Sequence, residues 1–231
     1  MKLVIVDRDG TLCVEREGYL QTPDDWAPLP GALDAIARLN HAGYQVVIAA
    51  NLPGLGRGLF DMAALNAIHA RMNKQVAAAG GRIEAVFFCP HTPDEGCNCR
   101  KPLPGLFQQI GERYKLDLTQ VHAVGDSERD VQAAVAAGCV PHLVLTGKAP
   151  PAQTDPLPPP FPVGTRVHTD LAAFATTFIA EMQALDAARA ETEAKARAEQ
   201  MKKDTVLLTT ATPAGVRELE VLEVRYPAPP A

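Results

Sequence analysis

Short apolar runs alternate with helix-like periodic segments along the first 148 residues of the chain. Apolar runs without polar alternation are typical of strands that are buried on both faces of a sheet. Segments whose apolar residues recur every three or four positions predict amphipathic helices. Because the two kinds alternate, we expect an α/β fold with a parallel sheet between helices. The sequence predicts strands at residues 3–6, 45–49, 85–88, 122–124 and 142–145, and helices at residues 31–41, 59–79, 105–114 and 128–137.

The pattern changes after residue 148. Seven prolines fall between residues 149 and 162, and this density predicts a stiff connector because proline neither continues a helix nor pairs in a sheet. A strand-like segment around Val167 and a helix follow. That helix carries one apolar stripe, formed by Leu171, Phe174, Phe178, Met182 and Leu185.

The last part of the chain has no apolar face. Ala, Glu, Lys and Arg dominate residues 187–203 and predict a solvated helix, and a short β-like patch at residues 206–209 precedes a proline-rich tail. We predict four parts, namely an α/β domain at 1–148, a connector at 149–165, a strand and helix packed on the core at 166–185, and a solvated helix and tail of unknown role at 186–231.

Composition and charge narrow the class of protein. The chain has 231 residues, 47% of them hydrophobic and 21% charged, with a net charge of −5. This composition is typical of a globular protein and not of proteins that bind nucleic acid or anionic membranes. No apolar run reaches the ~18–20 residues of a membrane span, and residues 3–6 are too short a run for a secretory signal. We expect a cytoplasmic protein that binds neither nucleic acid nor membrane, and we predict a monomer.

Acidic residues follow two of the predicted strands. Asp7 and Asp9 come directly after residues 3–6, and Asp126 and Asp130 come after residues 122–124. Ligands of open α/β sheets bind at the carboxyl ends of the strands, where these carboxylates would meet. Such a set suits Mg²⁺, and one carboxylate could attack a phosphorus atom while another exchanges a proton. The same residues are also common in turns and helix caps, so these readings stay open for each motif taken alone.

The acidic motifs and a cationic segment, taken together, resemble the haloacid dehalogenase superfamily of phosphotransferases. The matching pieces are DRDGT at 7–11, Lys101 within CRKP, and GDSERD at 125–130, in the order of that family. The resemblance implies a Rossmann-like domain, here without a large cap domain. It implies that Asp7 becomes a phospho-aspartate, that Asp9 is the general acid/base, and that Lys101 steadies the phosphoryl group. The implied magnesium ligands are Asp7, the backbone carbonyl of Asp9 and Asp126, with Asp130 in support.

Three of the five cysteines crowd into eleven residues. In a reducing compartment such crowding indicates a metal site, and three thiolates with one imidazole complete a tetrahedral, structural zinc shell. A chance cluster of reduced thiols is the alternative. Cys13 and Cys139 are left over. The predicted zinc ligands are Cys89, His91, Cys97 and Cys99.

The zinc motif narrows the resemblance to phosphatases of heptose bisphosphates, which serve lipopolysaccharide-core precursor synthesis, and to the similar histidinol-phosphate phosphatases. GLGRG after the second strand favours the heptose enzymes. The resemblance implies a small phosphorylated sugar as substrate. The implied substrate-binding residues are Glu15, Gly18, Tyr19, Asn51, Arg57, Arg100, Lys101 and Ser127. For Arg57, a solvated arginine in a loop is an equal alternative.

The chain departs from the family pattern after the second strand. The family has threonine followed by Asn-Gln-Ser-Gly, whereas this chain has Ala50, Asn51, Leu52, Pro53 and Gly54. The threonine hydroxyl donates a hydrogen bond to the phosphoryl group, and losing one such donor typically costs about 10²–10³ in turnover. The departure leaves three possibilities: a weakened phosphatase, a preference for another phosphate ester, or a non-catalytic ligand-binding relative. The retained aspartates argue against the last.

Overall fold

The computed structural model describes residues 1–147 and 157–210, with side chains as far as residue 203. The chain divides into two compact units, Met1–Glu181 and Met182–Ala231. About half of the predicted proline-rich connector, residues 149–156, lies outside the described residues. The four-part division expected from the sequence stays a prediction.

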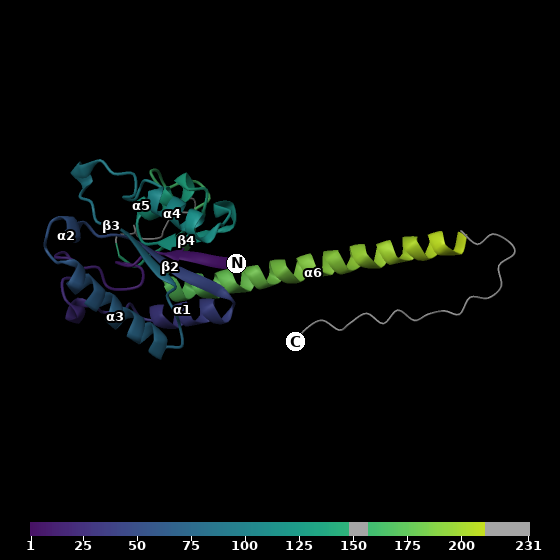
Figure 1. The fold of residues 1–231 in the computed structure, drawn as a ribbon, viewed down its shortest axis with the longest axis horizontal. Coiled ribbons are helices and arrows are strands. Elements are labelled where there is room, and N and C mark those ends of the chain that lie inside the picture. The colour runs from purple at the N-terminus through teal and green to yellow at the C-terminus, as the bar shows by residue number, and fades with distance from the viewer. Residues whose placement is uncertain (148–156, 211–231) are drawn as a thin grey trace. The chain divides into compact units, whose positions relative to one another are not determined.

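Six parallel strands form the sheet of the first unit (Figure 1). Their order is β3-β2-β1-β4-β5-β6, which is the strand order of the doubly wound Rossmann fold. The predicted α/β, Rossmann-like class is therefore confirmed. The strands are β1 (Lys2–Val6), β2 (Tyr44–Asn51), β3 (Ala85–Cys89), β4 (His122–Gly125), β5 (Val140–Val144) and β6 (Arg166–His168).

Six α-helices lie in the described residues, and the four predicted within residues 1–148 begin and end within three residues of expectation. The packed helix predicted up to residue 185 and the solvated helix predicted at 187–203 are instead one continuous helix, α6. Asp61 caps α3 by accepting a hydrogen bond from the amide of Ala64, which explains why that helix begins after residue 61 rather than at 59. The short helix α2, which begins at Pro53, had no counterpart in the sequence prediction. The helices are α1 (Ala32–His41), α2 (Pro53–Gly56), α3 (Met62–Ala78), α4 (Gly105–Tyr114), α5 (Glu128–Ala136) and α6 (Leu171–Thr210).

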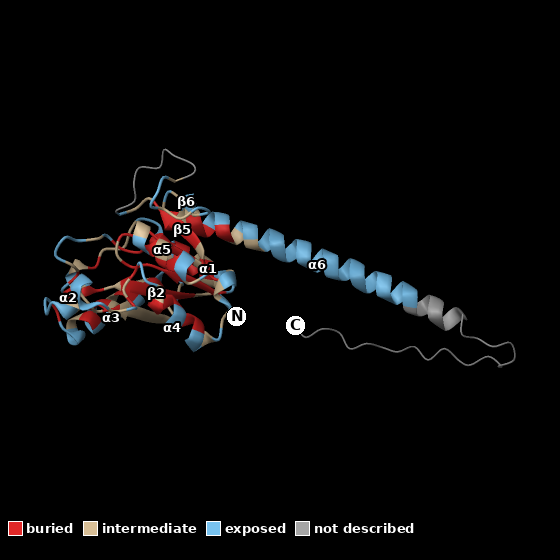
Figure 2. Ribbon diagram, turned by 90° about the horizontal axis from the view of Figure 1, so that it is seen from above, coloured by how far each residue is buried: buried red, intermediate tan, exposed pale blue. Residues whose placement is uncertain are grey.

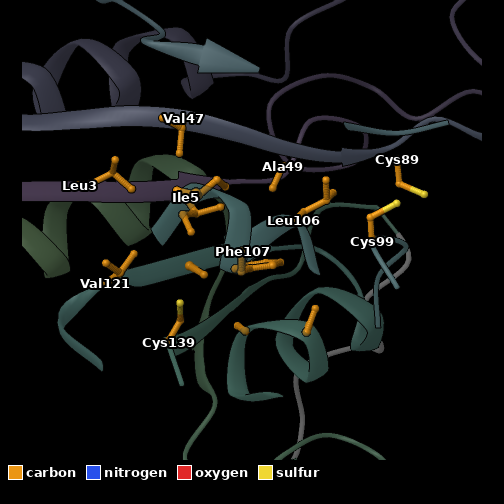
Figure 3. Packing of buried hydrophobic residues seen from close by; sticks show 14 residues of the cluster. Leu3, Ile5, Val47, Ala49, Cys89, Cys99, Leu106, Phe107, Val121 and Cys139 are labelled. Atoms are coloured by element: carbon orange, nitrogen blue, oxygen red, sulfur yellow. The ribbon is translucent and has the colours of Figure 1, made fainter. Parts of the chain in front are cut away.

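Both faces of the sheet are buried, as the unbroken apolar runs predict (Figure 2). On one face, Leu3 and Ile5 of β1 and Val47 of β2 pack with Leu106 and Phe107 of α4, as Figure 3 shows. Alternate residues of β1, Val4 and Val6, are equally buried and face the other side of the sheet. The sheet is thus a rigid platform for the loops at its carboxyl edge.

Three histidines on neighbouring strands, His122 of β4, His142 of β5 and His168 of β6, form a hydrogen-bonded chain. Nδ1 of His122 lies 2.8 Å from Nε2 of His142, and Nδ1 of His142 lies 3.0 Å from Nε2 of His168. Phe174 and Phe178 of α6 pack against the imidazole rings. Parallel pairing of β4, β5 and β6 brings these side chains together although they are 20 and 26 positions apart in the sequence.

The second unit is helical over residues 182–210, and its side chains through residue 203 are almost all exposed (Figure 2). The β-like patch expected at residues 206–209 is wrong, because α6 continues through Thr210. Helix propagation from the long preceding run of good helix formers outweighs the strand preference of these few residues. None of the described helices has the length and hydropathy needed to cross a membrane.

Candidate active site

The ends of the two central strands meet at the point where the strand order reverses. Val6 of β1 is in register with Val124 of β4, so Asp7 and Asp126 emerge from adjacent strands at the same edge of the sheet. The amide of Asp7 continues this pairing by donating to the carbonyl of Val124 at 2.9 Å. In doubly wound folds, this reversal is where ligands bind.

Gly10 permits the close approach of these loops. Its φ is +86°, and a Cβ added there would lie 2.5 Å from Oδ2 of Asp126. Both the left-handed backbone and the contact exclude a side chain, so the turn after β1 needs glycine. Thr11 also reaches across this turn, and its hydroxyl donates to Oδ1 of Asp126 at 3.4 Å.

Lys101 joins three elements at the bottom of the site. Its Nζ lies 2.6 Å from Oδ1 of Asp7 and 2.5 Å from Oδ1 of Asp130, and it donates to the carbonyl of Ala49 at 2.7 Å. Lys101 is only 3% exposed. A buried ammonium with three anionic or carbonyl acceptors is satisfied as a donor, and it fixes the loop after β3 to the ends of β1 and β2.

Asp130 supports the site and caps a helix with the same carboxylate. Its Oδ2 accepts hydrogen bonds from the amide and the hydroxyl of Ser127, the N-cap of α5, at 3.0 and 2.5 Å. Its Oδ1 is taken by Lys101. Both oxygens are therefore engaged, which suits the supporting role expected for Asp130 better than a direct one.

The charges of this cluster are strongly coupled. Burial raises the pKa of Asp7 well above its ordinary value; Lys101 opposes the rise, and the carboxylates of Asp130 and Asp126 add to it. Burial works against the charge of Lys101, but Asp130 and Asp7 outweigh it and raise its pKa. Lys101 pairs with two of the three buried carboxylates, Asp7 and Asp130. A divalent cation bound among the carboxylate oxygens of Asp7, Asp126 and Asp130 would stabilise the cluster further.

The carboxylate oxygens fit a magnesium ion. One oxygen each from Asp7, Asp126 and Asp130 lie within 4.8 Å of one another. Mg²⁺ takes oxygen ligands at about 2.0–2.1 Å and keeps several waters. The two carboxylates expected as ligands, Asp7 and Asp126, lie at an open cleft and so suit this ion. The backbone carbonyl of Asp9, expected as a further ligand, belongs to the same turn.

Asp9 is held by its neighbour. Nε and Nη2 of the buried Arg8 donate to the two oxygens of Asp9 at 3.0 and 2.7 Å. The thiol of Cys13 donates to Oδ1 of Asp9 at 3.4 Å, and Nη1 of Arg8 lies 3.5 Å from Nε2 of His69. The Asp9 carboxylate is therefore positioned at the cleft by a bidentate ion pair that the sequence motif did not reveal.

The four residues of the cysteine–histidine motif come together beside this cleft. Sγ of Cys89 lies 3.5 Å from Nδ1 of His91 and 3.6 Å from Sγ of Cys97, and Nδ1 of His91 lies 3.3 Å from Sγ of Cys99. Tetrahedral Zn²⁺ with bonds of about 2.3 Å to sulfur and about 2.0 Å to nitrogen separates its ligand atoms by about 3.5–3.8 Å. The donor set and its dimensions therefore fit zinc.

The zinc-type loop leads directly to Lys101. Arg100 donates through Nη1 to the carbonyl of His91 at 3.3 Å, and Gly105 at the start of α4 donates its amide to the carbonyl of Asn98 at 3.1 Å. The backbone of Asn98 packs so closely on Gly105 that no Cβ fits there. A metal ion in this loop would thus hold Arg100 and Lys101 in place.

An open cleft gathers most residues expected from the sequence. It is lined by Asp7, Asp9, Glu15, Tyr19, Asn51, Arg100, Lys101, Asp126 and Ser127. Among the described residues, Gly18 and Arg57 stay outside this lining: Gly18 lies in a neighbouring depression, and Arg57 donates to the hydroxyl of Tyr19 at 3.1 Å.

The sequence prediction missed two cleft residues, Arg16 and Arg129. Arg16 lies beside Glu15, in the segment expected to bind substrate, and Arg129 lies within the GDSERD motif. For Arg129, the available signal was a cationic residue within a motif otherwise assigned to metal binding.

Three residues at the end of β2 and just after it differ from the family pattern, and the structure shows where each one lies. Ala50, Leu52 and Pro53 are all buried, and Pro53 also lines the cleft and begins α2. Proline presets the backbone angle of a first helical turn, so it suits this position structurally. It offers no hydroxyl or amide hydrogen to a phosphate, however.

Known proteins that are similar to this chain belong to the family that its motifs resemble. A HAD-hydrolase-like family model matches residues 98–173. A D-glycero-beta-D-manno-heptose-1,7-bisphosphate 7-phosphatase from Bordetella bronchiseptica is 51% identical over 181 residues, which are 78% of this chain and 99% of the relative. The Pseudomonas aeruginosa protein of the same name is 46% identical over 77% of this chain and 97% of its own length.

Solved structures show the same likeness. The crystal structure of D,D-heptose 1,7-bisphosphate phosphatase from B. bronchiseptica, complexed with magnesium and phosphate, has a TM-score of 0.74 at 52% identity, and covers 78% of this chain and 99% of that one. The Burkholderia thailandensis phosphatase has a TM-score of 0.61 at 49% identity, with the same two coverages. The chain therefore belongs to the heptose 1,7-bisphosphate 7-phosphatase family of HAD-like hydrolases.

Proposed function

We propose that this chain removes the 7-phosphate from D-glycero-D-manno-heptose 1,7-bisphosphate through an aspartyl-phosphate at Asp7. The observation that carries the proposal is the contact of Lys101 with Asp7 at the strand reversal, beside Asp126 and Asp130. The names of relatives with 46–51% identity supply the substrate class.

The first step is attack by a carboxylate oxygen of Asp7 on the phosphorus. The bond from phosphorus to the sugar oxygen breaks, and Asp9 gives that oxygen a proton. To do so, the Asp9 carboxyl must release at least one of its two bonds to Arg8. Lys101 lies within hydrogen-bond distance of Asp7 and would stabilise the negative charge of the transferring phosphoryl group.

In the second step, water attacks the phosphorus of the aspartyl-phosphate while Asp9 accepts its proton. The Asp7–phosphorus bond breaks, and inorganic phosphate leaves. Mg²⁺, held by Asp7, Asp126 and the backbone of Asp9, would neutralise phosphate charge and allow a carboxylate to approach an anion. We propose Zn²⁺ as a structural ion at Cys89, His91, Cys97 and Cys99, because that shell has no open position.

We also propose a cytoplasmic location and a small phosphorylated sugar as the partner of the cleft. A reducing compartment keeps the four-residue zinc-type shell free of disulfides, and all five cysteines have free thiols. The monomeric state stays a prediction.

A substrate panel tests the function. The purified chain with Mg²⁺ is given heptose 1,7-bisphosphate and histidinol phosphate in parallel, phosphate release is followed, and the sugar product is identified by phosphorus NMR. We expect release from the bisphosphate, with heptose 1-phosphate as product. Faster turnover of histidinol phosphate would favour the alternative phosphatase, and no release from either would favour a ligand-binding relative weakened at Ala50 and Pro53.

A further inference from the structure

Arg129 is an uncommitted cation at the mouth of the cleft. It is the second residue of α5, it is exposed, and it lines the cleft together with the catalytic carboxylates. Its guanidinium has no hydrogen-bond or ion-pair partner among the described side chains and backbone. An unpaired arginine is free to bind an anionic ligand with two parallel hydrogen bonds.

The other cations of the cleft are already engaged to different degrees. Lys101 is buried and bound to Asp7 and Asp130. Arg16 donates to the carbonyl of Asp25 at 3.0 Å and lies 3.6 Å from its carboxylate. Among the described residues, Arg100 donates to the neutral carbonyl of His91, which does not compensate its charge. Of the cations that line the cleft in this part of the chain, Arg100 and Arg129 therefore provide the uncompensated positive charge.

The ion pair at the bottom of the cleft connects these two arginines. Arg100 precedes Lys101, Arg129 precedes Asp130, and Lys101 and Asp130 are 2.5 Å apart. The capping bonds between Ser127 and Asp130 fix the first turn of α5, which carries Arg129. The loop after β3 and the start of α5 thus present one arginine each to the same cleft.

We propose that Arg129 is a specificity-determining residue that binds the second, non-reacting phosphate of a sugar bisphosphate. This inference rests on the proposed function. The reacting phosphate must lie against the buried Asp7, and the second phosphate is separated from it by the sugar, so it falls farther out, where exposed side chains line the cleft. A second phosphate dianion also needs positive charge that Lys101, engaged with two carboxylates, does not provide.

Steady-state kinetics on two substrates test the assignment. The Arg129→Met variant and the wild type are compared on heptose 1,7-bisphosphate and on heptose 7-phosphate, which lacks the second phosphate. We expect the ratio of kcat/KM for the bisphosphate to that for the monophosphate to fall about 10- to 100-fold, mainly through KM, because a charge-assisted hydrogen bond is lost. Arg129→Lys restores part of the ratio. Arg113→Met, which removes an exposed arginine of α4 outside the cleft lining, is the matched control.

The outcomes separate the inference from the function on which it rests. An unchanged ratio in Arg129→Met, with wild-type activity present, would overturn the assignment of Arg129 alone. An equal loss on both substrates would also overturn it, because the residue would then act on the transferred phosphate or on folding. No phosphate release by the wild type from either substrate would overturn the proposed function and the inference together.

Discussion

The side chain of Asn51 makes two hydrogen bonds to the backbone of Lys101. Its Nδ2 donates to the Lys101 carbonyl at 3.0 Å, and its Oδ1 accepts from the Lys101 amide at 3.1 Å. Asn51 is the last residue of β2, so this pair of bonds ties the loop that carries Lys101 to the sheet. Each polar atom of the Asn51 amide thus makes one hydrogen bond to the Lys101 backbone, and we propose that the residue positions Lys101 rather than holding substrate.

Asn51→Ala should therefore lower kcat by about tenfold, because Lys101 loses the two bonds that set its position. KM should change less than kcat. Asn40 provides a matched control, since its amide joins two backbone groups in the same manner, at Tyr44 and Arg82, away from the cleft. A change in KM alone for Asn51→Ala would contradict the positioning role and favour direct substrate binding.

The zinc content of the protein should depend on the cysteines of the Cys89–Cys99 cluster. Wild-type protein purified without chelator should hold about one equivalent of zinc by elemental mass spectrometry, and Cys97→Ala should lose most of it, because three ligands rarely complete a structural site. Cys139→Ala, at a buried cysteine outside the cluster, should retain it. Equal zinc content in the two variants would contradict the assigned ligands.

Folding stability should fall in mild acid because of the histidine chain. Burial, followed by the charges of the histidines and Arg166 around it, lowers the pKa of His142 to about 2, and burial likewise lowers the pKa of His122 to about 4. The unfolded chain binds protons on these residues near pH 6.5, and the folded chain does not. Stability is thus fully present above pH 6.5 and is lost as the pH falls below it.

Urea denaturation at pH 7 and pH 5 measures this effect. His142 alone should contribute about 2 kcal/mol to the loss of unfolding free energy between pH 7 and pH 5. His142→Phe should remove that contribution, whereas substitution of the exposed His41 should not. The same pH dependence of the unfolding free energy in wild type and His142→Phe would show that the three hydrogen-bonded histidines do not cause the loss of stability in acid.

Restoring the family's hydroxyl residues at positions 50 and 53 should raise kcat, whereas Asn51→Ala should lower it. The double substitution Ala50→Thr and Pro53→Ser should raise kcat by about 10- to 100-fold, since each new hydroxyl can donate to the phosphoryl group. Pro53→Ser removes the proline that begins α2, so thermal unfolding should be measured beside the kinetics. Unchanged kcat in a folded double variant would mean that other donors already fill these positions.

The sequence predicted the elements whose signal is local. Unbroken apolar runs located β1 to β5, and three- and four-residue periodicity located α1, α3, α4 and α5. The strand-end positions of Asp7 and Asp126 were sufficient to predict that they meet, because parallel strands end at one edge of the sheet. The zinc-type motif lies within eleven residues, so its spacing alone indicated a cluster.

Relationships that depend on side-chain direction could not be predicted in this way. The bidentate pair of Arg8 and Asp9 depends on rotamers, and the histidine chain depends on the register of three strands. The place of Arg129 at the cleft depends on where α5 begins relative to β4. In each case the sequence contained the residue but not the geometry that gives it a partner or leaves it free.

The most direct test of the account is the turnover of heptose 1,7-bisphosphate by Asp7→Asn. The amide cannot attack phosphorus as a carboxylate does, so kcat should fall by at least about 10³-fold. Asp34→Asn, at an exposed carboxylate of α1, should behave as the wild type. Turnover by Asp7→Asn at a rate close to the wild type would contradict the assignment of Asp7 as the nucleophile and with it the proposed mechanism.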